Sequence, residues 1–387
     1  MNSPIICEVL RSSQKEDVPE SLHRGHIAVV DGEGKLIFSA GNPSFQTFAR
    51  SVLKPFQLVS VIESGAADYF SFSEKELAIM AGSHSGSAAH LEVVQGILAK
   101  IGLDENALEC GTHQPRDSEQ SRLINEGKRH LCQLHNNCSG KNSGMLSICR
   151  KNGWDYKDYK SLSHKLQQYV LGKVREILEL PPLEDMTFAI DGCGVPTPYL
   201  PIRVFAMGFA RLAREDGTSR GGTIRDDRSR EGANQGDASR EGANQGDTSR
   251  EGANQGDASG QGGNFPCKES LGRVRKVMAE CPEMVAGEGR VCTAIIRSTR
   301  GRVIAKGGGE GIYCVGDSER GIGVCLKIED GSARAVAPAA IETMRQLGLL
   351  DGSQLEELRE FRTTPVTNHS GRIVGEVRPC FTLEKCG

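Results

Sequence analysis

Residues 50–56, Arg50-Ser51-Val52-Leu53-Lys54-Pro55-Phe56, place a hydroxyl and an amine three positions apart at the start of an apolar run. If the run is helical, Ser51 and Lys54 lie on one face, about one turn apart. Pro55 is compatible with a first helical turn, because the N–H that it lacks would have no partner there. The stripe expected to be buried consists of Val52, Phe56, Val59 and Ile62. We therefore predict a helix that ends at Gly65 and holds Ser51 near its N-terminus, inside the protein.

This spacing matters chemically because a serine hydroxyl is a poor nucleophile without an adjacent base. A lysine can be that base when burial or a second cation lowers its pKa. Ser-x-x-Lys is also the first of three sequence elements in serine acylases of the β-lactamase and penicillin-binding type. The alternative is an N-cap serine beside an exposed lysine. The segment Ser12-Ser13-Gln14-Lys15 repeats the pattern among charged residues, and we interpret it as solvated surface.

Composition excludes several classes of protein. The chain has 387 residues, a formal net charge of -3, one Trp and no basic block, which argues against a nucleic-acid partner. No apolar stretch reaches the ~18 residues of a membrane span. The N-terminal residues lack the pattern of a signal peptide. We therefore expect a cytoplasmic protein with no membrane or nucleic-acid partner.

The cysteine pattern agrees with that compartment. Thirteen cysteines are scattered along the chain without a Cys-x-x-Cys pair. In a reducing compartment most of them would be small buried hydrophobic residues. The strongest zinc-binding spacing is absent.

Local patterns predict the elements of the first half of the chain. Residues 26–30 and 36–40 flank a glycine turn and are typical of a β-hairpin. Ser73-x-x-Glu76 is a capping box, and an amphipathic helix follows at residues 88–101. His90 and His113 are each either structural or catalytic. The other elements expected are a helix at residues 161–180, a buried strand at 187–190 and a helix at 201–214.

Two glycine-containing segments in this half are candidate binding loops. Residues 136–144 are nine small or polar residues ahead of an apolar helix, and such a loop could hold an anion or an oxygen ligand, although a plain turn is the alternative. Residues 191–196 follow the predicted strand, where sites tend to be built.

The second half predicts strands and a final helix. We expect a helix at residues 269–284, strands at 302–309, 311–315 and 323–328, a helix at 333–347 and a late strand at 373–377. Strands at both ends of the chain would share one antiparallel sheet. The predicted fold class is thus α/β (α+β), with a mostly helical middle region.

A repeat separates the two halves. Ser229-Arg230-Glu231-Gly232-Ala233-Asn234-Gln235-Gly236-Asp237 recurs almost unchanged from Ser239 and Ser249. This composition buries too little apolar area to offset ordering entropy. We predict that residues 215–264 are a disordered insertion, most simply a tolerated loop expansion, and that residues 1–214 and 265–387 together form one catalytic domain of two lobes.

Three elements stand in a meaningful order. Ser51-x-x-Lys54 is followed by a Ser83 loop and by Lys306-Gly307-Gly308 on a predicted strand. This parallels the Ser-x-x-Lys, Ser-x-Asn and Lys-Thr-Gly order of the β-lactamase-like acylases. The middle element departs from that pattern because Ser83-His84-Ser85 has no Asn, and Gly307 replaces the hydroxyl residue after the lysine.

With these residues the chain resembles the L-asparaginase II family of the rhizobial type, whose members have a β-lactamase-like fold. The matching segments are RSVLKPFQ from Arg50, AGSHSG from Ala81, HLEVVQGILAKIGLDE from His90, CGTHQP from Cys110, NNCSGK from Asn136, DGCGVPTPYLP from Asp191 and AKGGGEGIYCVG from Ala305. They cover nearly all of the chain outside the repeat.

The resemblance implies hydrolysis of L-asparagine to L-aspartate and ammonia. It implies that Ser51 is the nucleophile with Lys54 as its base, and that Ser83 and Lys306 are a second serine–lysine pair. The residues expected to bind substrate are Arg50, His84, Asn137, Gly308 and Gly309. The resemblance also implies a homodimer.

The family's metal site is implied as well. Its two cysteines and one lysine correspond to Cys138, Lys141 and Cys193, with Asp191 close by, and the metal is zinc. This chain departs there, because Asn142 and Ser143 stand where members commonly have His and Ala. Cys292 stands where an acidic residue is common.

Two alternatives stay open. A glutaminase, or another small-amide or peptide acylase, could use the same scaffold, since one methylene is worth only ~1–3 kcal/mol in a pocket. A non-catalytic protein could bind asparagine or a metal, but a binder has no need of a buried amine beside a hydroxyl.

Overall fold

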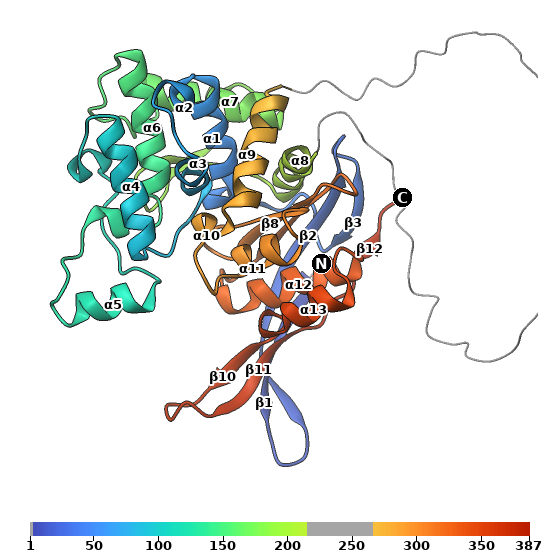
Figure 1. Cartoon of the computed structure of the whole chain (residues 1–387). Helices are drawn as coiled ribbons and strands as arrows, with labels where there is room; N and C mark the ends of the chain where they lie inside the picture. Colours follow the sequence, from blue (N-terminus) through green and yellow to red (C-terminus); the bar gives the residue numbers. More distant parts are fainter. Residues whose placement is uncertain (1–2, 215–265) are drawn as a thin grey trace, which may run out of the picture.

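The computed structural model describes residues 3–214 and 266–387, and in them a sheet built from both ends of the chain lies beside a group of helices from its middle (Figure 1). The strands are β1 Ile5–Ser12, β2 Asp17–Asp31, β3 Leu36–Ala40, β4 Gln46–Phe48, β5 Phe188–Ile190, β6 Pro196–Pro201, β7 Val303–Gly307, β8 Ile312–Asp317, β9 Ile322–Ile328, β10 Thr364–Thr367, β11 Ile373–Pro379 and β12 Glu384–Lys385. The α-helices are α1 Lys54–Glu63, α2 Ala66–Tyr69, α3 Glu74–Ala81, α4 Ala88–Lys100, α5 Ser118–Asn125, α6 Ser139–Asn152, α7 Lys165–Leu178, α8 Ile202–Ala213, α9 Lys268–Glu280, α10 Pro282–Val285, α11 Val291–Ser298, α12 Val336–Gln346 and α13 Gly352–Glu357.

The strand β2 organises the main sheet. It is 15 residues long, and its first half pairs with β1 while its second half pairs with β9 on one side and β3 on the other. The nine-stranded sheet has the order β10-β11-β1-β2-β9-β8-β7, with β3 and β12 off this path. Its paired strands are antiparallel. The predicted hairpin and the predicted sharing of strands from both ends of the chain are confirmed.

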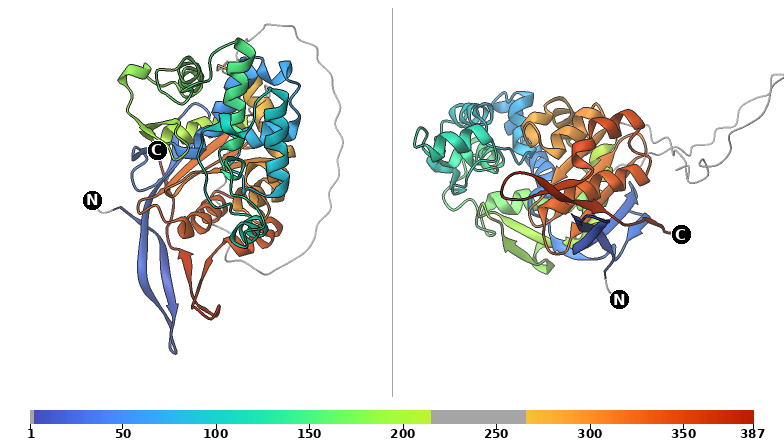
Figure 2. Two further views of the ribbon diagram at one scale, coloured as in Figure 1. Left: turned by 90° about the vertical axis from the view of Figure 1, so that its left-hand side faces the viewer. Right: turned by 90° about the horizontal axis from the view of Figure 1, so that it is seen from below.

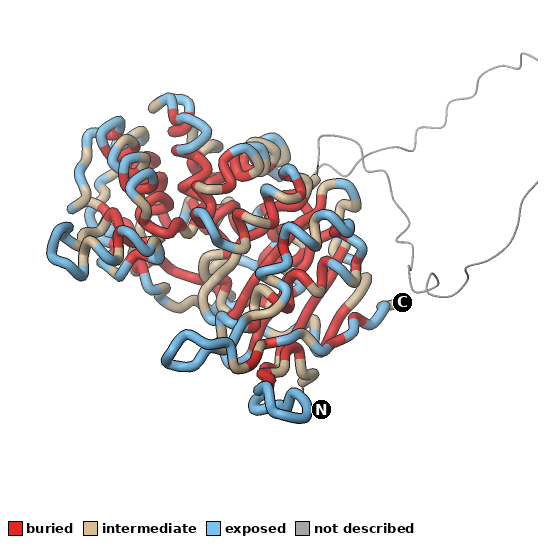
Figure 3. The backbone as a smooth tube through the Cα atoms, turned by 60° about the horizontal axis from the view of Figure 1, so that its bottom comes forward, coloured by how far each residue is buried: buried red, intermediate tan, exposed pale blue. Residues whose placement is uncertain are grey.

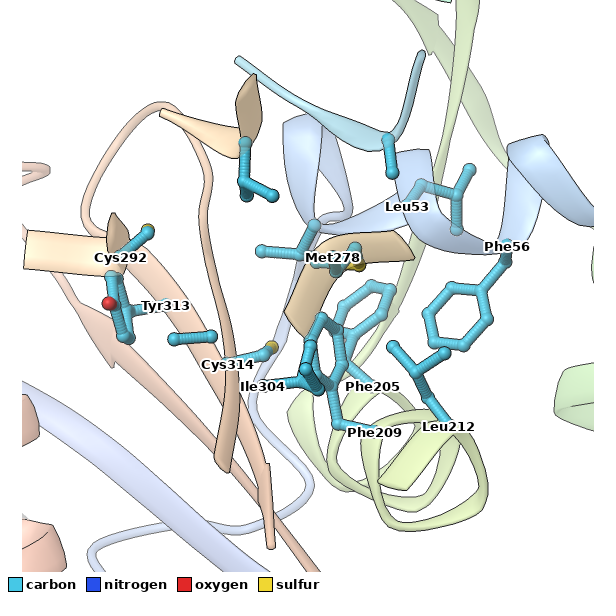
Figure 4. Close-up of a cluster of buried hydrophobic side chains, with 14 of the residues drawn as sticks. Leu53, Phe56, Phe205, Phe209, Leu212, Met278, Cys292, Ile304, Tyr313 and Cys314 are labelled. Carbon is cyan, nitrogen blue, oxygen red and sulfur yellow. The ribbon is translucent and has the colours of Figure 1, made fainter. Parts of the chain in front are cut away.

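Helix α8 joins the sheet to the helical group. It packs on β2, β8 and β9. The approach is so close that a Cβ on Gly323 of β9 would lie 1.9 Å from the carbonyl oxygen of Ala206, so only glycine fits there. Figure 4 shows α8 side chains Phe205, Phe209 and Leu212 meeting Leu53 and Phe56 from the other side and Ile304 from the sheet. All six side chains are at most 1% exposed, which makes this a core between the two halves.

The helical group is arranged around α1, which contacts α3, α6, α7 and α9. The capping box at the start of α3 is confirmed, because the Ser73 hydroxyl accepts from the Glu76 N–H and the Glu76 carboxylate accepts from the Ser73 N–H at 2.7 Å. The amphipathic helix at residues 88–101 is confirmed as α4, and its apolar residues face the core.

Three local predictions are wrong. The strand at residues 187–190 was expected to be buried, but β5 is an edge strand of the small sheet β4-β6-β5, and Ile190 is 69% exposed. Residues 136–144 were expected to form a loop, yet α6 begins at Ser139. The helix expected at residues 269–284 is broken at Cys281, because Pro282 begins the separate helix α10.

Two hairpins extend away from the body of the molecule (Figure 2). They are formed by β1 with β2 and by β10 with β11, and their outer ends are exposed (Figure 3). Residues 12–15, the second Ser-x-x-Lys, lie at the exposed end of the first hairpin, as predicted. The predicted insertion at residues 215–264 lies outside the described residues.

Two bulk expectations can be checked in the described chain. None of its helices is both long enough and apolar enough to cross a membrane. All thirteen cysteines lie within the described ranges, and each is a free thiol there.

Candidate active site

One serine hydroxyl lies between two buried amines. The Oγ of Ser83 is 3.0 Å from the Nζ of Lys54 and 2.7 Å from the Nζ of Lys306. Lys54 is the first residue of α1, Ser83 lies in the segment between α3 and α4, and Lys306 is next to the last residue of β7. Three separate elements therefore converge on this oxygen, which we call the serine–lysine centre.

The two lysines have different surroundings. The Lys54 Nζ also donates to the carbonyl oxygens of Gly82 at 2.7 Å and Asn137 at 3.0 Å, so three oxygens lie around its N–H groups. Lys306 is 1% exposed and donates to the Gly307 carbonyl at 2.7 Å. Burial, followed by repulsion from the Lys54 charge, lowers the pKa of Lys306 to about 7. Lys306 is therefore able to accept a proton near neutral pH.

Ser51, the predicted nucleophile, occupies a different position. It lies in the short 3-10 helix Arg50–Leu53 that precedes α1, and it is half-buried. Within the described part of the chain its hydroxyl has no hydrogen-bond partner, so it is not bound to Lys54 as the Ser-x-x-Lys spacing suggested. The centre therefore joins Lys54 to Ser83 and Lys306, with Ser51 one helical turn away from Lys54.

A pocket enclosing about 240 Å³, partly open to solvent, lies on another side of Lys54. Arg50 and Asp191 line it and form an ion pair, with 2.7 Å between Nε and Oδ1. The Arg50 N–H donates to the Thr197 hydroxyl at 2.9 Å. This hydrogen bond stabilises the left-handed backbone of Arg50, whose φ is 50°. Nothing in the sequence around Arg50 indicated that Thr197 or Asp191 would be its partner.

The other predicted substrate-binding residues have different surroundings, and not all of them face the pocket. Gly309 lies against Arg50, since a Cβ added there would be 3.1 Å from Nη2. The Gly308 N–H donates to the Ile312 carbonyl at 2.8 Å, so this N–H is already occupied, and the next N–H after β7 is that of Gly309. The Asn137 side chain accepts from the Cys138 thiol at 3.1 Å, and its carbonyl accepts from Lys54.

His84 is not brought to the pocket. It is 1% exposed; its Nδ1 accepts from the Gly86 N–H at 3.2 Å and its Nε2 lies 2.9 Å from the Ser139 hydroxyl. Burial and the neighbouring His90 lower the pKa of His84 well below its usual range. Both ring nitrogens therefore serve the local structure, and His90 is likewise bound, to Ser87 and to the Glu283 carbonyl.

A second buried cluster lies where α6 begins. The Lys141 Nζ donates to the Cys193 Sγ at 3.0 Å, and the Cys138 thiol is near enough for each cysteine to affect the pKa of the other. All three residues are at most 5% exposed. Small residues allow this burial, since a Cβ on Gly140 would lie 2.7 Å from the Ile79 carbonyl oxygen of α3.

Comparison with known families identifies the family of this chain. The model of the L-asparaginase II family matches residues 9–233 and 252–379. The chain belongs to the L-asparaginase II family. This is a family of amidohydrolases, and a small-molecule substrate fits an enzyme of this kind. No curated protein matches the sequence.

Solved structures give only distant likeness. Mglu in its native form is 12% identical with a TM-score of 0.36, over 86% of this chain and 66% of that chain. Another Mglu structure is 15% identical with a TM-score of 0.34, over 86% of this chain and 69% of that chain. Mglu in its tris and glutamate form is 15% identical with a TM-score of 0.34, over 86% and 61%. The chain thus spans about two thirds of these proteins, and likeness at this level carries no argument.

The cysteine–lysine cluster suits the metal that family resemblance implies, because zinc prefers nitrogen and sulfur ligands. The hydrogen bond with Cys138, and then the charge of Lys141, lower the pKa of Cys193 well below the ordinary thiol range. Burial opposes a charge on Lys141, but the attraction of Cys193 and Cys138 outweighs burial, and the pKa of Lys141 is raised. A metal bound there would have to displace a proton from the lysine.

The residues that depart from the family pattern lie beside this cluster without joining it. Asn142 donates to the Tyr159 hydroxyl at 2.6 Å and to the Leu108 carbonyl at 3.2 Å. The Ser143 hydroxyl donates to the Gly140 carbonyl at 2.8 Å. In the described ranges, no three His, Cys, Asp or Glu side chains are grouped as metal ligands, so a metal here would depend on the lysine as its third ligand.

Proposed function

We propose that this member of the L-asparaginase II family hydrolyses L-asparagine to L-aspartate and ammonia. The single observation that supports this best is the Ser83 hydroxyl held between Lys54 and Lys306, 3.0 and 2.7 Å away. A binding protein gains nothing from two buried amines on one hydroxyl, whereas an acyl-transfer enzyme needs a path for protons.

The proposed reaction uses both serine–lysine pairs. Lys306, with its pKa of about 7, takes the proton of Ser83, and Ser83 takes one from Lys54. The uncharged Lys54 then accepts the proton of Ser51 as its oxygen attacks the side-chain carbonyl. The C–N bond breaks and ammonia leaves with a proton returned from the relay. Water then hydrolyses the β-aspartyl ester, and the Ser51 hydroxyl is restored.

The negatively charged oxygen of the tetrahedral intermediate needs hydrogen-bond donors. The N–H groups of Ser51 and Gly309 are proposed for this role, and one such donor is typically worth roughly 3 kcal/mol in the transition state. Arg50 and Asn137 are proposed to contact the substrate as well. His84 is proposed only to hold the loop that positions Ser83.

The wider features implied by family resemblance belong to the same proposal. They are a β-lactamase-like arrangement of the sheet and helices, one catalytic domain interrupted by the insertion, a homodimer and a cytoplasmic location. The antiparallel sheet shared by both ends of the chain, with helices between them, supports the first of these. The unbridged cysteines agree with a reducing compartment.

Ammonia release with L-asparagine and with L-glutamine, in the native protein and in Ser51→Ala, tests the function. Asparagine-dependent release should vanish in the variant. A slow ester substrate should leave an acyl group on the peptide that contains Ser51, located by mass spectrometry. An acyl group on Ser83 would reverse the roles of the two serines. Preference for glutamine would favour the glutaminase alternative, and no release from either amide would refute the proposal.

Zinc is proposed to bind through Cys138, Lys141 and Cys193, and when bound it would supply a positive charge beside the pocket. A ligand at 100 times its Kd adds about 2.7 kcal/mol to the free energy of unfolding. Zinc should therefore raise the melting temperature of the native protein but not of Cys193→Ser. Cys149→Ser, which replaces another buried cysteine on the helix α6 that holds Lys141, is the matched control and should keep the zinc response. The absence of any shift in the native protein would refute the zinc site.

A further inference from the structure

Strand β7, which carries Lys306, is the last strand of the main sheet. Its inner edge pairs with β8, and in the described part of the chain no strand pairs with its outer edge. Helix α11 packs against β7. The backbone N–H groups on the outer edge therefore need acceptors other than a neighbouring strand.

Two side chains supply such acceptors, one at each end of β7. The hydroxyl of Thr299, directly after α11, accepts from the Val303 N–H at 3.2 Å. The sulfur of Cys292, in the first turn of α11, accepts from the Gly307 N–H at 3.2 Å. Cys292 is 6% exposed and Thr299 is 4% exposed. The two contacts are of the same kind, but only the contact of Cys292 lies next to Lys306.

The backbone that Cys292 holds would otherwise be free to move. Gly307, Gly308 and Gly309 are three consecutive glycines, and glycine has more conformational freedom than other residues. On the inner edge, the Gly308 N–H donates to the Ile312 carbonyl at 2.8 Å. With Cys292 on the outer edge, the N–H groups on both sides of the Gly307 carbonyl are fixed.

Glycine is also what allows the sulfur to approach. A Cβ on Gly307 would lie 3.3 Å from Cδ2 of Tyr313, its register partner in β8, and 3.8 Å from the Cys292 sulfur. Figure 4 shows Cys292 beside Tyr313. The sulfur and the aromatic ring therefore enclose Gly307 between α11 and β8.

The position of Gly307 determines where the Lys306 amine lies. The Lys306 Nζ donates to the Gly307 carbonyl at 2.7 Å and lies 2.7 Å from the Ser83 hydroxyl. A tilt of Gly307 would move one acceptor of this amine and change its distance from Ser83. Contacts thus connect Cys292 through Gly307 to Lys306, although the proposed reaction does not use the thiol.

We propose that Cys292 is a positioning residue for the base: its sulfur fixes Gly307 and thereby holds the Lys306 amine against Ser83. This inference rests on the proposed amide hydrolysis. It assigns Cys292 a part in proton transfer rather than in substrate binding, so loss of the contact should lower kcat and not raise KM. It also requires only an acceptor at this position, so a hydroxyl can replace the sulfur.

Three variants separate the acceptor from the packing of the side chain. Cys292→Ala should lower kcat for L-asparagine by about 10- to 100-fold with KM little changed, because a small displacement of a reacting group is enough to slow the reaction this much. Cys292→Ser keeps an acceptor and should retain most of the native kcat. Thr299→Val, the matched control, removes the acceptor at the other end of β7 and should leave kcat unchanged even if the melting temperature falls. Equal losses of kcat in Thr299→Val and Cys292→Ala would overturn the proposal.

A charge at the same position gives a second readout, which a merely structural role would not move. Cys292→Asp keeps an acceptor and places a carboxylate in the first turn of α11, where it is favourable, beside Lys306. The pKa of Lys306 is about 7, and a negative charge nearby should raise this pKa, and with it the pH at which kcat/KM rises, by about one unit or more. The other groups that act on or respond to this amine are unchanged in the variant, namely Lys54 of α1, Arg116 before α5, Cys138 before α6 and Cys314 of β8. An unchanged pH profile in Cys292→Asp would overturn the proposal.

A measurement without substrate separates this inference from the proposed function. Hydrogen exchange of the Gly307 amide, followed by NMR, should be faster in Cys292→Ala than in the native protein, and unchanged in Thr299→Val. Equal exchange in Cys292→Ala and the native protein would overturn the inference whatever the activity. Normal ammonia release by the native enzyme, with the same kcat in Cys292→Ala, would overturn the positioning role alone. Absent ammonia release with faster exchange in Cys292→Ala would refute the function and leave Cys292 as the residue that holds Gly307.

Discussion

Two lysines of this protein are buried beside a reactive side chain, and their surroundings move their pKa values in opposite directions. Lys306 lies 2.7 Å from the Ser83 hydroxyl, and burial together with Lys54 lowers its pKa to about 7. Lys141 lies 3.0 Å from the Cys193 sulfur, and its pKa is raised despite burial. Both lysines are less than 5% exposed, so depth of burial does not distinguish them.

The difference comes from the sign of the neighbouring charges. For Lys306, the charge of Lys54, and more weakly that of Arg116, adds to the effect of burial, and together they outweigh the opposite effect of Cys292 and Cys138. Lys141 faces the sulfurs of Cys193 and Cys138 and the Asp191 carboxylate. A buried amine among cations gives up its proton and becomes a base, whereas one among anions keeps it and becomes a counter-ion. The fold thus prepares one lysine for proton transfer and the other for holding negative sulfur.

Replacement of Lys306, the proposed base, should have the largest effect on the rate. Lys306→Met should lower kcat for L-asparagine by about 10²–10⁴-fold, because the proton relay loses its acceptor. Steady-state ammonia release at saturating substrate measures the loss. Lys327→Met is the control, since Lys327 is a buried lysine of β9 with a lowered pKa that does not contact Ser83. A Lys306→Met enzyme that kept more than a tenth of native kcat would exclude Lys306 as the base.

Removing the counter-ion should act on stability instead. Lys141→Met leaves the Cys193 sulfur without its buried cation, and breaking such a pair typically costs about 3–5 kcal/mol. Denaturant unfolding in the presence of a chelator measures this change. Lys151→Met, near the end of the same helix, should change the free energy of unfolding by no more than about 0.5 kcal/mol. Equal stability of Lys141→Met and the native protein would show that the cluster does not need the lysine's charge.

The elements that the sequence predicts well are those with a strong local signal. Helix α4 has an apolar stripe at helical spacing, and α3 begins with a capping box. The β1 strand and the first half of β2 were missed because much of that hairpin is exposed and shows no alternation of polar and apolar residues. The start of α6 was missed because its small residues resemble a loop until α3 is packed against them.

The sequence predicted which residues form the site better than it predicted which of them contact one another. The order of Ser51-x-x-Lys54, Ser83 and Lys306 suggested that these residues meet, although they are far apart in sequence. That Lys54 binds Ser83 rather than Ser51 depends on how α3 and β7 approach α1, which no local pattern encodes.

The pH dependence of the rate should change least, and it also distinguishes the two lysines. The amine of Lys306 is a base only when unprotonated, so kcat/KM should rise with pH through about 7 and level off above it, reaching about a tenth of the plateau at pH 6. The groups whose charges act on this titration are Lys54, Arg116, Cys138 and Cys292.

The same amine must affect stability with a definite sign. Its folded pKa of about 7 is below its ordinary value, so between pH 7 and roughly 10.4 the unfolded chain binds the extra proton. The contribution of Lys306 to the free energy of unfolding therefore rises with pH across that window and is constant below it. Lys306→Met should remove this slope, whereas Lys141→Met should not, because the amine of Lys141 keeps its proton in the folded chain. A rate profile that was flat from pH 6 to 8.5, or a stability slope unchanged in Lys306→Met, would mean that the lysine beside Ser83 is a counter-ion like its counterpart.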